Sequence, residues 1–350
     1  MKSQQMVAHG APLQEFESAT PTAAAGQVIV KISHCGVCHS DLHLFDGHFE
    51  LGNGKQLSVA KSGEKLPFTL GHEIVGEVAA VGAGVSAVSV GDKRVIYPWI
   101  GCNQCPTCER GDEHLCGRPA ALGVTVDGGY SDYVVVPDEK YLIDFEGVDE
   151  ALACTYACSG LTAYSALQRV LPIVDGDDIL VVGAGGLGMM AIQMIKAITG
   201  LSPLVADIDD AKLAAAMAAG AKKTYNSSHP EALRELKADT HGGAYAALDF
   251  VGADSSFSFG NGALRKGGKQ IMVGMIGGSM SMPLPLIPMR AITIAGGYVG
   301  SLQEMKDMMV LVRAGKIAPI PIDVRPMNQA FQSLEDLRNG KVTGRVVLEN

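Results

Sequence analysis

The chain has 350 residues, of which 47% are hydrophobic and 43 are glycines, and it carries a formal net charge of −9. This length favours two domains, and this composition is typical of a turn-rich, well-buried α/β protein. The acidic balance and the lack of a basic block in the sequence argue against nucleic-acid binding, because that affinity comes largely from Lys and Arg neutralising phosphates.

The N-terminal segment and the cysteines indicate the cellular setting. The first residues, MKSQQMVAHGAPLQEF, lack the apolar stretch of a secretory signal, and the sequence has no run of about 18 apolar residues that could cross a membrane. The 8 cysteines could form disulfides, but close spacings in a long chain without an export signal favour metal binding. We therefore expect a cytoplasmic protein with reduced thiols.

Residues 1–157 are predicted to form a β-rich domain, which we expect to be the catalytic domain. Short runs rich in Val and Ile are separated by Gly, Pro and Asp, as the strands of a mixed or antiparallel sheet would be. These runs are QVIVKI, GEVAAVG, DKRVIYP and YSDYVVVP.

Three segments offer ligands for an open metal site, namely Cys38 in CGVCHSD, His72 in GHE and Cys158 in CSGLT. The spacing alone leaves alternatives. Cys35 and Cys38 form a C-x-x-C pair that also suits a redox dithiol or half of another zinc cage. Cys154 lies one helical turn before Cys158 and competes with it, and a buried cysteine is often just a small core residue.

A second metal site is predicted in a lobe at about residues 98–117, which contains GCNQCPTCERGDEHLC. Its four cysteines follow one another at spacings of three, three and eight residues. This pattern suits a closed tetrahedral cage of thiolates around Zn²⁺, which holds a lobe together. The predicted ligands are Cys102, Cys105, Cys108 and Cys116.

Residues 158–295 show the βαβ rhythm of a nucleotide-binding domain. Runs such as DILVVGAG and PLVADI alternate with helical runs such as MMAIQMIKAI and AKLAAAMAAGA, which predicts a parallel sheet. After the first of these strands, Gly183, Gly185 and Gly188 stand at G-x-G-x-x-G spacing. Asp207 ends the next predicted strand.

Each part of this turn has a mechanical reason in dinucleotide binding. Gly183 allows the tight turn, Gly185 lets the backbone approach a pyrophosphate, and Gly188 permits close helix packing. The N-terminus of the helix then favours the anion. Asp207 is expected to accept the ribose hydroxyls and to repel a 2′-phosphate, so NAD is favoured over NADP. The alternative is an ordinary strand-to-helix turn in a glycine-rich protein.

The tail, residues 296–350, is predicted to return to the first domain. It contains two amphipathic helical segments, MKDMMVLVRAG and NQAFQSLEDLRNG, followed by GRVVLEN as a closing strand.

In their order along the chain, these segments resemble the zinc-dependent alcohol dehydrogenases of the medium-chain dehydrogenase/reductase family. The resemblance covers nearly the whole chain and rests on C-G-V-C-H-S-D, G-H-E-x-x-G-x-V, the four-cysteine lobe, C-x-G-L-T, the glycine-rich turn and the terminal G-R-V-V-L. It implies an α/β fold with a GroES-like β-rich catalytic domain and a Rossmann doubly wound parallel-sheet nucleotide domain. It also implies NAD, one catalytic and one structural zinc per chain, and a homodimer or homotetramer.

The resemblance assigns the catalytic chemistry residue by residue. Cys38, His72 and Cys158 match the ligands of the catalytic zinc, whose fourth position is left for water or substrate. Ser40 would pass the proton released from the alcohol to the nicotinamide ribose, and His43 would hand it towards solvent.

Two acids would support this zinc. Asp41 is expected to orient His72, and Glu73 is expected to lie close behind the metal. Without the resemblance, Asp41 reads equally well as a turn or cap residue, and His43 as an exposed loop histidine.

The resemblance also assigns the cofactor contacts. His39 and Arg345 would meet the pyrophosphate, Lys212 the adenosine ribose, and Thr162 the nicotinamide side of the pocket. The other predicted cofactor residues are Gly183, Gly185, Gly186, Leu187, Gly188, Asp207, Val251 and Val273.

The substrate is predicted from a long stretch between His43 and the GHE segment, at about residues 44–69, which should overhang the cleft. With YPWIGC and LIPMRAITIAGGYVGS, it resembles the branch containing 6-hydroxyhexanoate dehydrogenase, which implies medium-chain or ω-hydroxylated primary alcohols. Trp99, Leu51 and Tyr298 are candidate apolar walls. The candidate cations for a substrate carboxylate are His48, Lys55 and Arg290.

Other functions remain open from the sequence. A polyol, formaldehyde or aryl-alcohol dehydrogenase would use the same scaffold. A zinc-stabilised binding or scaffold protein would use the four-cysteine lobe for interaction, but it would not need the open ligand set with Ser40 and His43. We therefore predict a reversible, zinc-dependent and NAD-linked dehydrogenase that converts medium-chain or ω-hydroxylated primary alcohols to aldehydes.

Overall fold

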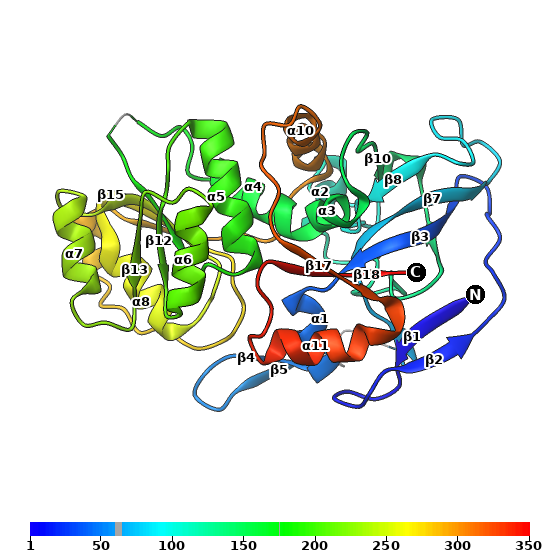
Figure 1. Cartoon of the computed structure of the whole chain (residues 1–350), viewed down its shortest axis with the longest axis horizontal. Helices are drawn as coiled ribbons and strands as arrows, with labels where there is room; N and C mark the ends of the chain where they lie inside the picture. Colours follow the sequence, from blue (N-terminus) through cyan, green and yellow to red (C-terminus); the bar gives the residue numbers. More distant parts are fainter. Residues whose placement is uncertain (60–64, 175) are drawn as a thin grey trace. The chain divides into compact units, whose positions relative to one another are not determined.

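The computed structural model describes residues 1–59, 65–174 and 176–350. The chain divides into two compact units, which Figure 1 labels by element. The catalytic unit comprises Met1–His48, Ser58–Leu161 and Gly300–Asn350, and the nucleotide unit comprises Phe49–Leu57 and Thr162–Val299.

The catalytic unit is built on a mixed sheet around two nine-residue strands, β3 and β7, which pair antiparallel. Within the described residues the strands follow the order β10–β8–β7–β3–β18–β17, and β9 pairs with β3. A smaller sheet has the order β2–β1–β6. The strand bounds are β1 Lys2–Met6, β2 Gln14–Glu17, β3 Val28–Gly36, β6 Phe68–Thr69, β7 Glu73–Val81, β8 Lys93–Ile96, β9 Tyr133–Val136, β10 Leu142–Ile143, β17 Ile322–Pro326 and β18 Arg345–Glu349.

All four runs that the sequence predicts as strands in this domain lie in the larger sheet, in β3, β7, β8 and β9. The helices of the unit lie between and after these strands. Their bounds are α1 His39–Asp46, α2 Pro106–Glu109, α3 Glu150–Thr155, α10 Leu302–Arg313 and α11 Ala330–Arg338, with a π-helical turn at Tyr156–Gly160 and 3₁₀ turns at Glu113–Leu115, Glu139–Tyr141 and Met327–Gln329.

The tail Gly300–Asn350 belongs to the catalytic unit. Its two predicted helices are α10 and α11, and its closing strand is β18. β18 runs antiparallel to the end of β3, with Val347 opposite Gly36 and Leu348 opposite Cys35. This pairing brings the last residues of the chain next to the segment that carries the first predicted metal ligand.

The nucleotide unit contains the predicted parallel sheet, with the order β13–β12–β11–β14–β15–β16 in the described residues. Every residue of β11 is buried, as expected for a strand covered by helices on both faces. The bounds are β11 Ile179–Val182, β12 Leu204–Asp207, β13 Lys223–Asn226, β14 Ala244–Asp249, β15 Leu264–Met272, β16 Thr293–Gly296, α4 Leu161–Gln168, α5 Gly186–Thr199, α6 Asp210–Ala218, α7 Ala232–Asp239, α8 Asp254–Ala263 and α9 Leu286–Arg290.

A hairpin from the long stretch after His43 belongs to the nucleotide unit rather than to the domain in which the sequence places it. Its strands are β4 His48–Glu50 and β5 Gln56–Ser58. The side chain of Asn53 donates a hydrogen bond to the Ser279 hydroxyl at 2.8 Å. A Cβ at Gly52 would lie 2.6 Å from the carbonyl carbon of Gly278, so the two backbones touch. Residues 60–64 of the stretch lie outside the described residues, and its position over a cleft stays a prediction.

In the described parts of the chain, the helices are all too short or too polar to span a bilayer.

Candidate active site

The three ligands predicted for the open site converge in the catalytic unit. The ligand atoms of Cys38, His72 and Cys158 all lie within 4.8 Å of one another, and all three residues are buried. His72 Nε2 is buried and has no hydrogen-bond partner among the described residues. Because a buried polar atom without a partner is costly, this imidazole and the two thiols fit a bound metal ion.

Each ligand stands at a break in regular structure. Cys38 is the extended residue just before helix α1, and His72 directly precedes strand β7. Cys158 lies in the π-helical turn Tyr156–Gly160, between α3 and α4. Single π turns occur mostly within α-helices and often at functional sites, because the extra residue turns side chains to new directions.

Asp41 forms hydrogen bonds with two of the predicted ligands. Its fully buried carboxylate accepts hydrogen bonds from His72 Nδ1 at 3.0 Å and from the backbone N–H of Cys38 at 2.9 Å. The N–H of Gly71 is a weaker donor at 3.3 Å. With Nδ1 donating to Asp41, the His72 ring keeps Nε2 as the atom available to a metal.

The three ligands affect one another's pKa. The hydrogen bond from the Cys158 thiol lowers the pKa of Cys38 well below its usual range. That same bond, together with burial, raises the pKa of Cys158. Burial acts to lower the pKa of His72, but the Asp41 carboxylate and Cys38 outweigh it and raise this pKa. A metal takes only deprotonated ligands, so its binding here would displace the protons held by Cys158 and His72.

Glu73 links the ligand segments to the C-terminal strand. Its carboxylate accepts a hydrogen bond from the backbone N–H of Ser159, in the turn that carries Cys158, at 3.1 Å. It also forms a buried ion pair with Arg345. Burial raises the pKa of Glu73 to about 7, whereas the guanidinium of Arg345 acts to lower it. This contact of Arg345 was not expected from the sequence, and its predicted role at the pyrophosphate stays a prediction.

The two competing cysteines are outside the ligand group. Cys35 is fully buried, and a Cβ at Gly71 would lie 2.8 Å from its sulfur. Cys154 is fully buried, and its thiol donates to the carbonyl of Ala151 at 3.2 Å. Neither joins the Cys38 cluster within the described residues. The geometry therefore favours core packing for both.

The predicted proton-relay residues lie on helix α1. Ser40 is half-buried, and its hydroxyl oxygen lies 3.9 Å from the Cys38 sulfur. His43 is also half-buried, and burial lowers its pKa below the usual 6.5. His39, the first residue of α1, is exposed.

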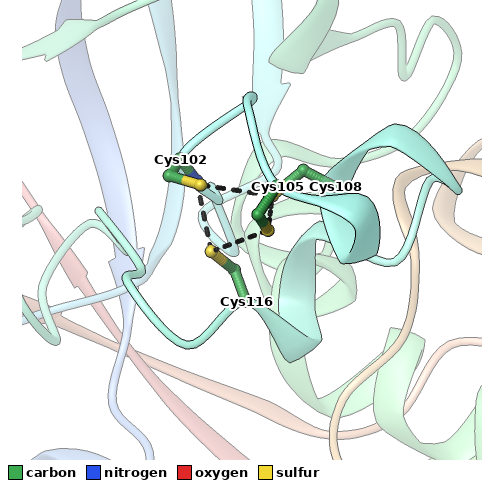
Figure 2. A group of neighbouring side chains, drawn as sticks. All are labelled: Cys102, Cys105, Cys108 and Cys116. Atoms are coloured by element: carbon green, nitrogen blue, oxygen red, sulfur yellow. Dashed lines mark hydrogen bonds between the residues drawn. The ribbon is translucent and has the colours of Figure 1, made fainter.

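The four cysteines of the lobe form a second compact group, shown in Figure 2. Cys108 lies 3.5 Å from Cys105 and 3.9 Å from Cys102, and Cys105 lies 3.8 Å from Cys116, measured between sulfurs. Tetrahedral zinc with Zn–S bonds of about 2.3 Å requires sulfurs about 3.8 Å apart. The four side chains therefore fit the closed cage that the sequence predicts.

Backbone N–H groups further support the lobe. Those of Arg118 and Cys102 donate to the Cys116 sulfur at 3.3 and 3.4 Å, which stabilises a thiolate there. The N–H of Cys108 acts in the same way on Cys105, whose pKa is lowered to about 6. Glu113 then ties the lobe to the 3₁₀ turn Glu139–Tyr141, just before β10, through a hydrogen bond from Tyr141 and an ion pair with Lys140.

The glycine-rich turn of the nucleotide unit requires glycine at two of its positions. Gly183 adopts a φ of +93°, which favours glycine. A Cβ at Gly188 would lie 1.8 Å from the Gly183 carbonyl oxygen, so only glycine allows this packing. A Cβ at Gly185 would meet open space, which leaves its backbone accessible to a ligand. Gly186 and Leu187 begin helix α5 directly after it.

Asp207 ends β12 beside this turn. Its carboxylate accepts a hydrogen bond from the Ala184 N–H at 2.7 Å, so the acid and the turn are held together. Val251 packs against Gly183, because a Cβ added at Gly183 would lie 2.6 Å from Cγ2 of Val251. Val273 follows β15 and is bonded through its N–H to Asp249. Lys212 lies in the first turn of α6, and Thr162 is buried in α4.

The candidate substrate residues fall in both units. Trp99 is buried in the catalytic unit, with its ring 5.3 Å from the His72 ring and its indole N–H bonded to the Ala157 carbonyl. Leu51 and Tyr298 belong to the nucleotide unit and are 46% and 45% exposed. Trp99 is thus the candidate wall that lies beside a metal ligand.

The candidate cations differ in their availability. Arg290 donates to the side chain and carbonyl of Asn261 and to the carbonyl of Leu264, so it caps the end of α8. His48 is half-buried, and its Nδ1 lies 3.0 Å from the Asp46 carbonyl oxygen. Lys55 is exposed in the hairpin. The capping role of Arg290 counts against its use for a substrate carboxylate.

Comparison with known proteins agrees with both units. Residues 24–146 match the family of the alcohol dehydrogenase GroES-like domain, and residues 186–314 match the zinc-binding dehydrogenase family. An NAD-dependent alcohol dehydrogenase of Sulfurisphaera tokodaii is 36% identical over 350 residues, which cover 99% of each chain.

Solved structures give the same result. The crystal structure of an alcohol dehydrogenase from Aeropyrum pernix matches with a TM-score of 0.90 and 28% identity, covering 100% of both chains. A cobalt- and zinc-bound alcohol dehydrogenase from Pyrobaculum aerophilum matches with a TM-score of 0.85 and 25% identity, over 100% of this chain and 99% of that one.

The chain is therefore an oxidoreductase with a GroES-like and a Rossmann domain, of the class that acts on the CH–OH group of alcohols with NAD. It belongs to the zinc-dependent alcohol dehydrogenases of the medium-chain dehydrogenase/reductase family. The resemblance to this family and the fold class predicted from the sequence are confirmed.

Proposed function

We propose that the protein reversibly oxidises medium-chain or ω-hydroxylated primary alcohols to aldehydes, with one catalytic and one structural zinc per chain. The observation that carries the catalytic part is the buried group of two thiols and one imidazole, with His72 Nε2 free of hydrogen bonds among the described residues. A zinc ion held there supplies Lewis-acid polarisation of the alcohol oxygen, and NAD supplies the hydride acceptor.

The chain itself orients the site and moves the proton. Asp41 fixes the tautomer of His72 through Nδ1 and fixes Cys38 through its backbone N–H. Ser40 is proposed to accept the proton of the alcohol through its hydroxyl, and His43 to carry it to solvent. A lowered pKa keeps the His43 imidazole neutral near pH 7, which is the form that accepts a proton.

For the relay, we expect the acid limb of alcohol oxidation to lie below pH 6.5, because burial lowers the pKa of His43 and preserves the neutral imidazole into mildly acidic solution. His43→Gln should remove that limb from the profile of kcat against pH and slow turnover by about a hundredfold. His229→Gln, at an exposed position of the nucleotide unit, serves as control. An unchanged limb in His43→Gln would exclude this residue from the relay.

The substrate proposal is tested with a ladder of alcohols from ethanol upwards, including ω-hydroxy acids, each assayed with NAD and with NADP. We expect kcat/KM with NAD to peak at medium chain length, because Trp99 presents apolar surface beside His72. Each buried methylene is worth about 0.8 kcal/mol, or roughly fourfold in kcat/KM. An optimum at ethanol would contradict the substrate class, and a preference for NADP would contradict the role of Asp207.

We also propose a homo-oligomer that uses the edge of the nucleotide sheet. β16 is an edge strand among the described residues, and exposed apolar side chains cluster in sequence just before it. Large apolar patches on a sheet edge favour association, because they remove both the patch and unpaired backbone groups from water. Light scattering of the purified protein checks this, and a monomer would refute it. The apolar residues are Met275, Ile276, Met280, Leu284 and Met289.

A further inference from the structure

We propose that Tyr130 is a positioning residue of the catalytic metal centre, acting on His72 through Asp41. The inference rests on the proposed zinc binding by Cys38, His72 and Cys158. No motif in the sequence points to Tyr130, which lies in GGYSDY, between the lobe and strand β9.

The contact that carries the inference is a buried hydrogen bond. The Tyr130 hydroxyl donates to Asp41 Oδ2 at 3.1 Å, and both side chains have 0% exposure. Asp41 Oδ2 also accepts the Cys38 N–H, while Oδ1 accepts His72 Nδ1. The Asp41 carboxylate therefore contacts two of the predicted zinc ligands, Cys38 and His72. Among the described residues, it accepts side-chain hydrogen bonds from His72 and from the Tyr130 phenol.

The backbone keeps the phenol in this position. The N–H of Tyr130 donates to the Leu70 carbonyl at 2.9 Å, and the N–H of Gly129 donates to the Gly71 carbonyl at 2.7 Å. Gly71 has a φ of +94°, and a Cβ there would lie 2.5 Å from the Tyr130 ring. The ring thus packs directly on the residue before His72, where only glycine leaves room for it.

The chemistry of the pair favours a fixed direction of donation. Burial and the nearby Asp41 charge raise the pKa of Tyr130 well above its usual range, so the phenol stays protonated. A buried carboxylate needs donors on both oxygens, because an unsatisfied charge in the interior is costly. Without the hydroxyl, Oδ2 keeps one backbone donor, and the carboxylate gains freedom to rotate away from His72.

The test is Tyr130→Phe, which deletes one oxygen and leaves the ring packed. We expect zinc at the catalytic site to be released to a competing chelator roughly three- to tenfold faster, which is less than the 10- to 100-fold effects of residues that touch ligands directly. We also expect the visible absorption bands of Co²⁺ at this site to shift. A purely structural role would lower thermal stability without changing either readout.

The matched control is Tyr225→Phe. Tyr225 is also buried, and its hydroxyl donates to the carboxylate of Asp239 at 2.8 Å, but it lies in the nucleotide unit. We expect this variant to release zinc at the parental rate and to keep the parental Co²⁺ spectrum. Equal zinc-release rates and spectra in the two variants would overturn the inference.

A double-mutant cycle with Asp41→Asn tests the path of the effect. If Tyr130 acts through Asp41, the double variant releases zinc at the rate of Asp41→Asn alone. Independent, additive effects would overturn the inference. Suppose that the parent binds zinc and oxidises alcohols, while Tyr130→Phe keeps the parental zinc-release rate and Co²⁺ spectrum. That result would refute this inference and leave the proposed function intact. A parent without zinc at Cys38, His72 and Cys158 would refute the proposed function first.

Discussion

Replacing Cys38 by serine is expected to abolish alcohol oxidation while leaving the protein folded. Cys38 supplies one of three converging ligand atoms, and its lowered pKa makes it the readier thiolate of the two cysteines. Turnover should fall by more than about a hundredfold. That is the largest loss usually seen when a residue that hydrogen-bonds to a metal ligand is replaced, and Cys38 is itself a predicted ligand. Metal analysis should show zinc falling from two ions to one per chain, measured beside kcat and the thermal unfolding midpoint.

The control for this variant is Cys154→Ser. Cys154 is buried close by in sequence to Cys158, but its thiol donates to the Ala151 carbonyl, a bond that a serine hydroxyl can also make. We expect this variant to keep both zinc ions and most of the activity. Loss of a zinc ion in Cys154→Ser, with two ions retained in Cys38→Ser, would reverse the ligand assignment.

Replacing Cys108 by serine is expected to cause the largest loss of stability. Cys108 is buried in the four-cysteine cage, and losing one of four ligands would remove the metal that joins Cys102, Cys105 and Cys116 across the lobe. We expect the free energy of unfolding to fall by at least about 4 kcal/mol, as for other losses of a structural metal. The measurements are the thermal unfolding midpoint, the zinc content and protease cleavage within residues 98–117.

Thr107→Ser is the control, because Thr107 lies in the same helix α2 and is not a ligand. It should retain two zinc ions and an unfolding midpoint close to that of the parent. At a temperature where Cys108→Ser remains folded, its activity per chain should approach that of the parent, because the lobe does no chemistry. Complete loss of activity in the folded variant would show that the lobe takes part in catalysis.

Several features could be predicted from the sequence because they depend on residues that are close together along the chain. Four cysteines within a short segment must lie near one another, so the cage follows from spacing. The same holds for Gly183 and Gly188, where a steric requirement between neighbours selects glycine. The strand runs of the catalytic domain are equally local, since short runs of Val and Ile bounded by Gly, Pro and Asp favour strands.

The spacing of residues in the sequence could not show which of two candidate side chains reaches a distant partner. Cys158 and Cys154 are one turn apart, and only the π turn at Tyr156–Gly160 decides which sulfur meets Cys38 and His72. Arg345 was predicted as a pyrophosphate contact, yet its guanidinium pairs with Glu73 because β18 pairs with β3. These contacts depend on strand pairing over long sequence separations.

The sequence by itself determined the family, from the order of its motifs, and the parallel nucleotide sheet, from its periodic pattern. The four-cysteine group follows from close spacing, whereas Cys38, His72 and Cys158 were predicted from the family resemblance. The tertiary structure alone decided that the hairpin at Phe49–Leu57 belongs to the nucleotide unit, that Arg290 caps α8 and that Tyr130 holds Asp41. A hydrogen bond or backbone approach between remote segments has no fixed spacing. It becomes visible only when the fold has brought the two partners together.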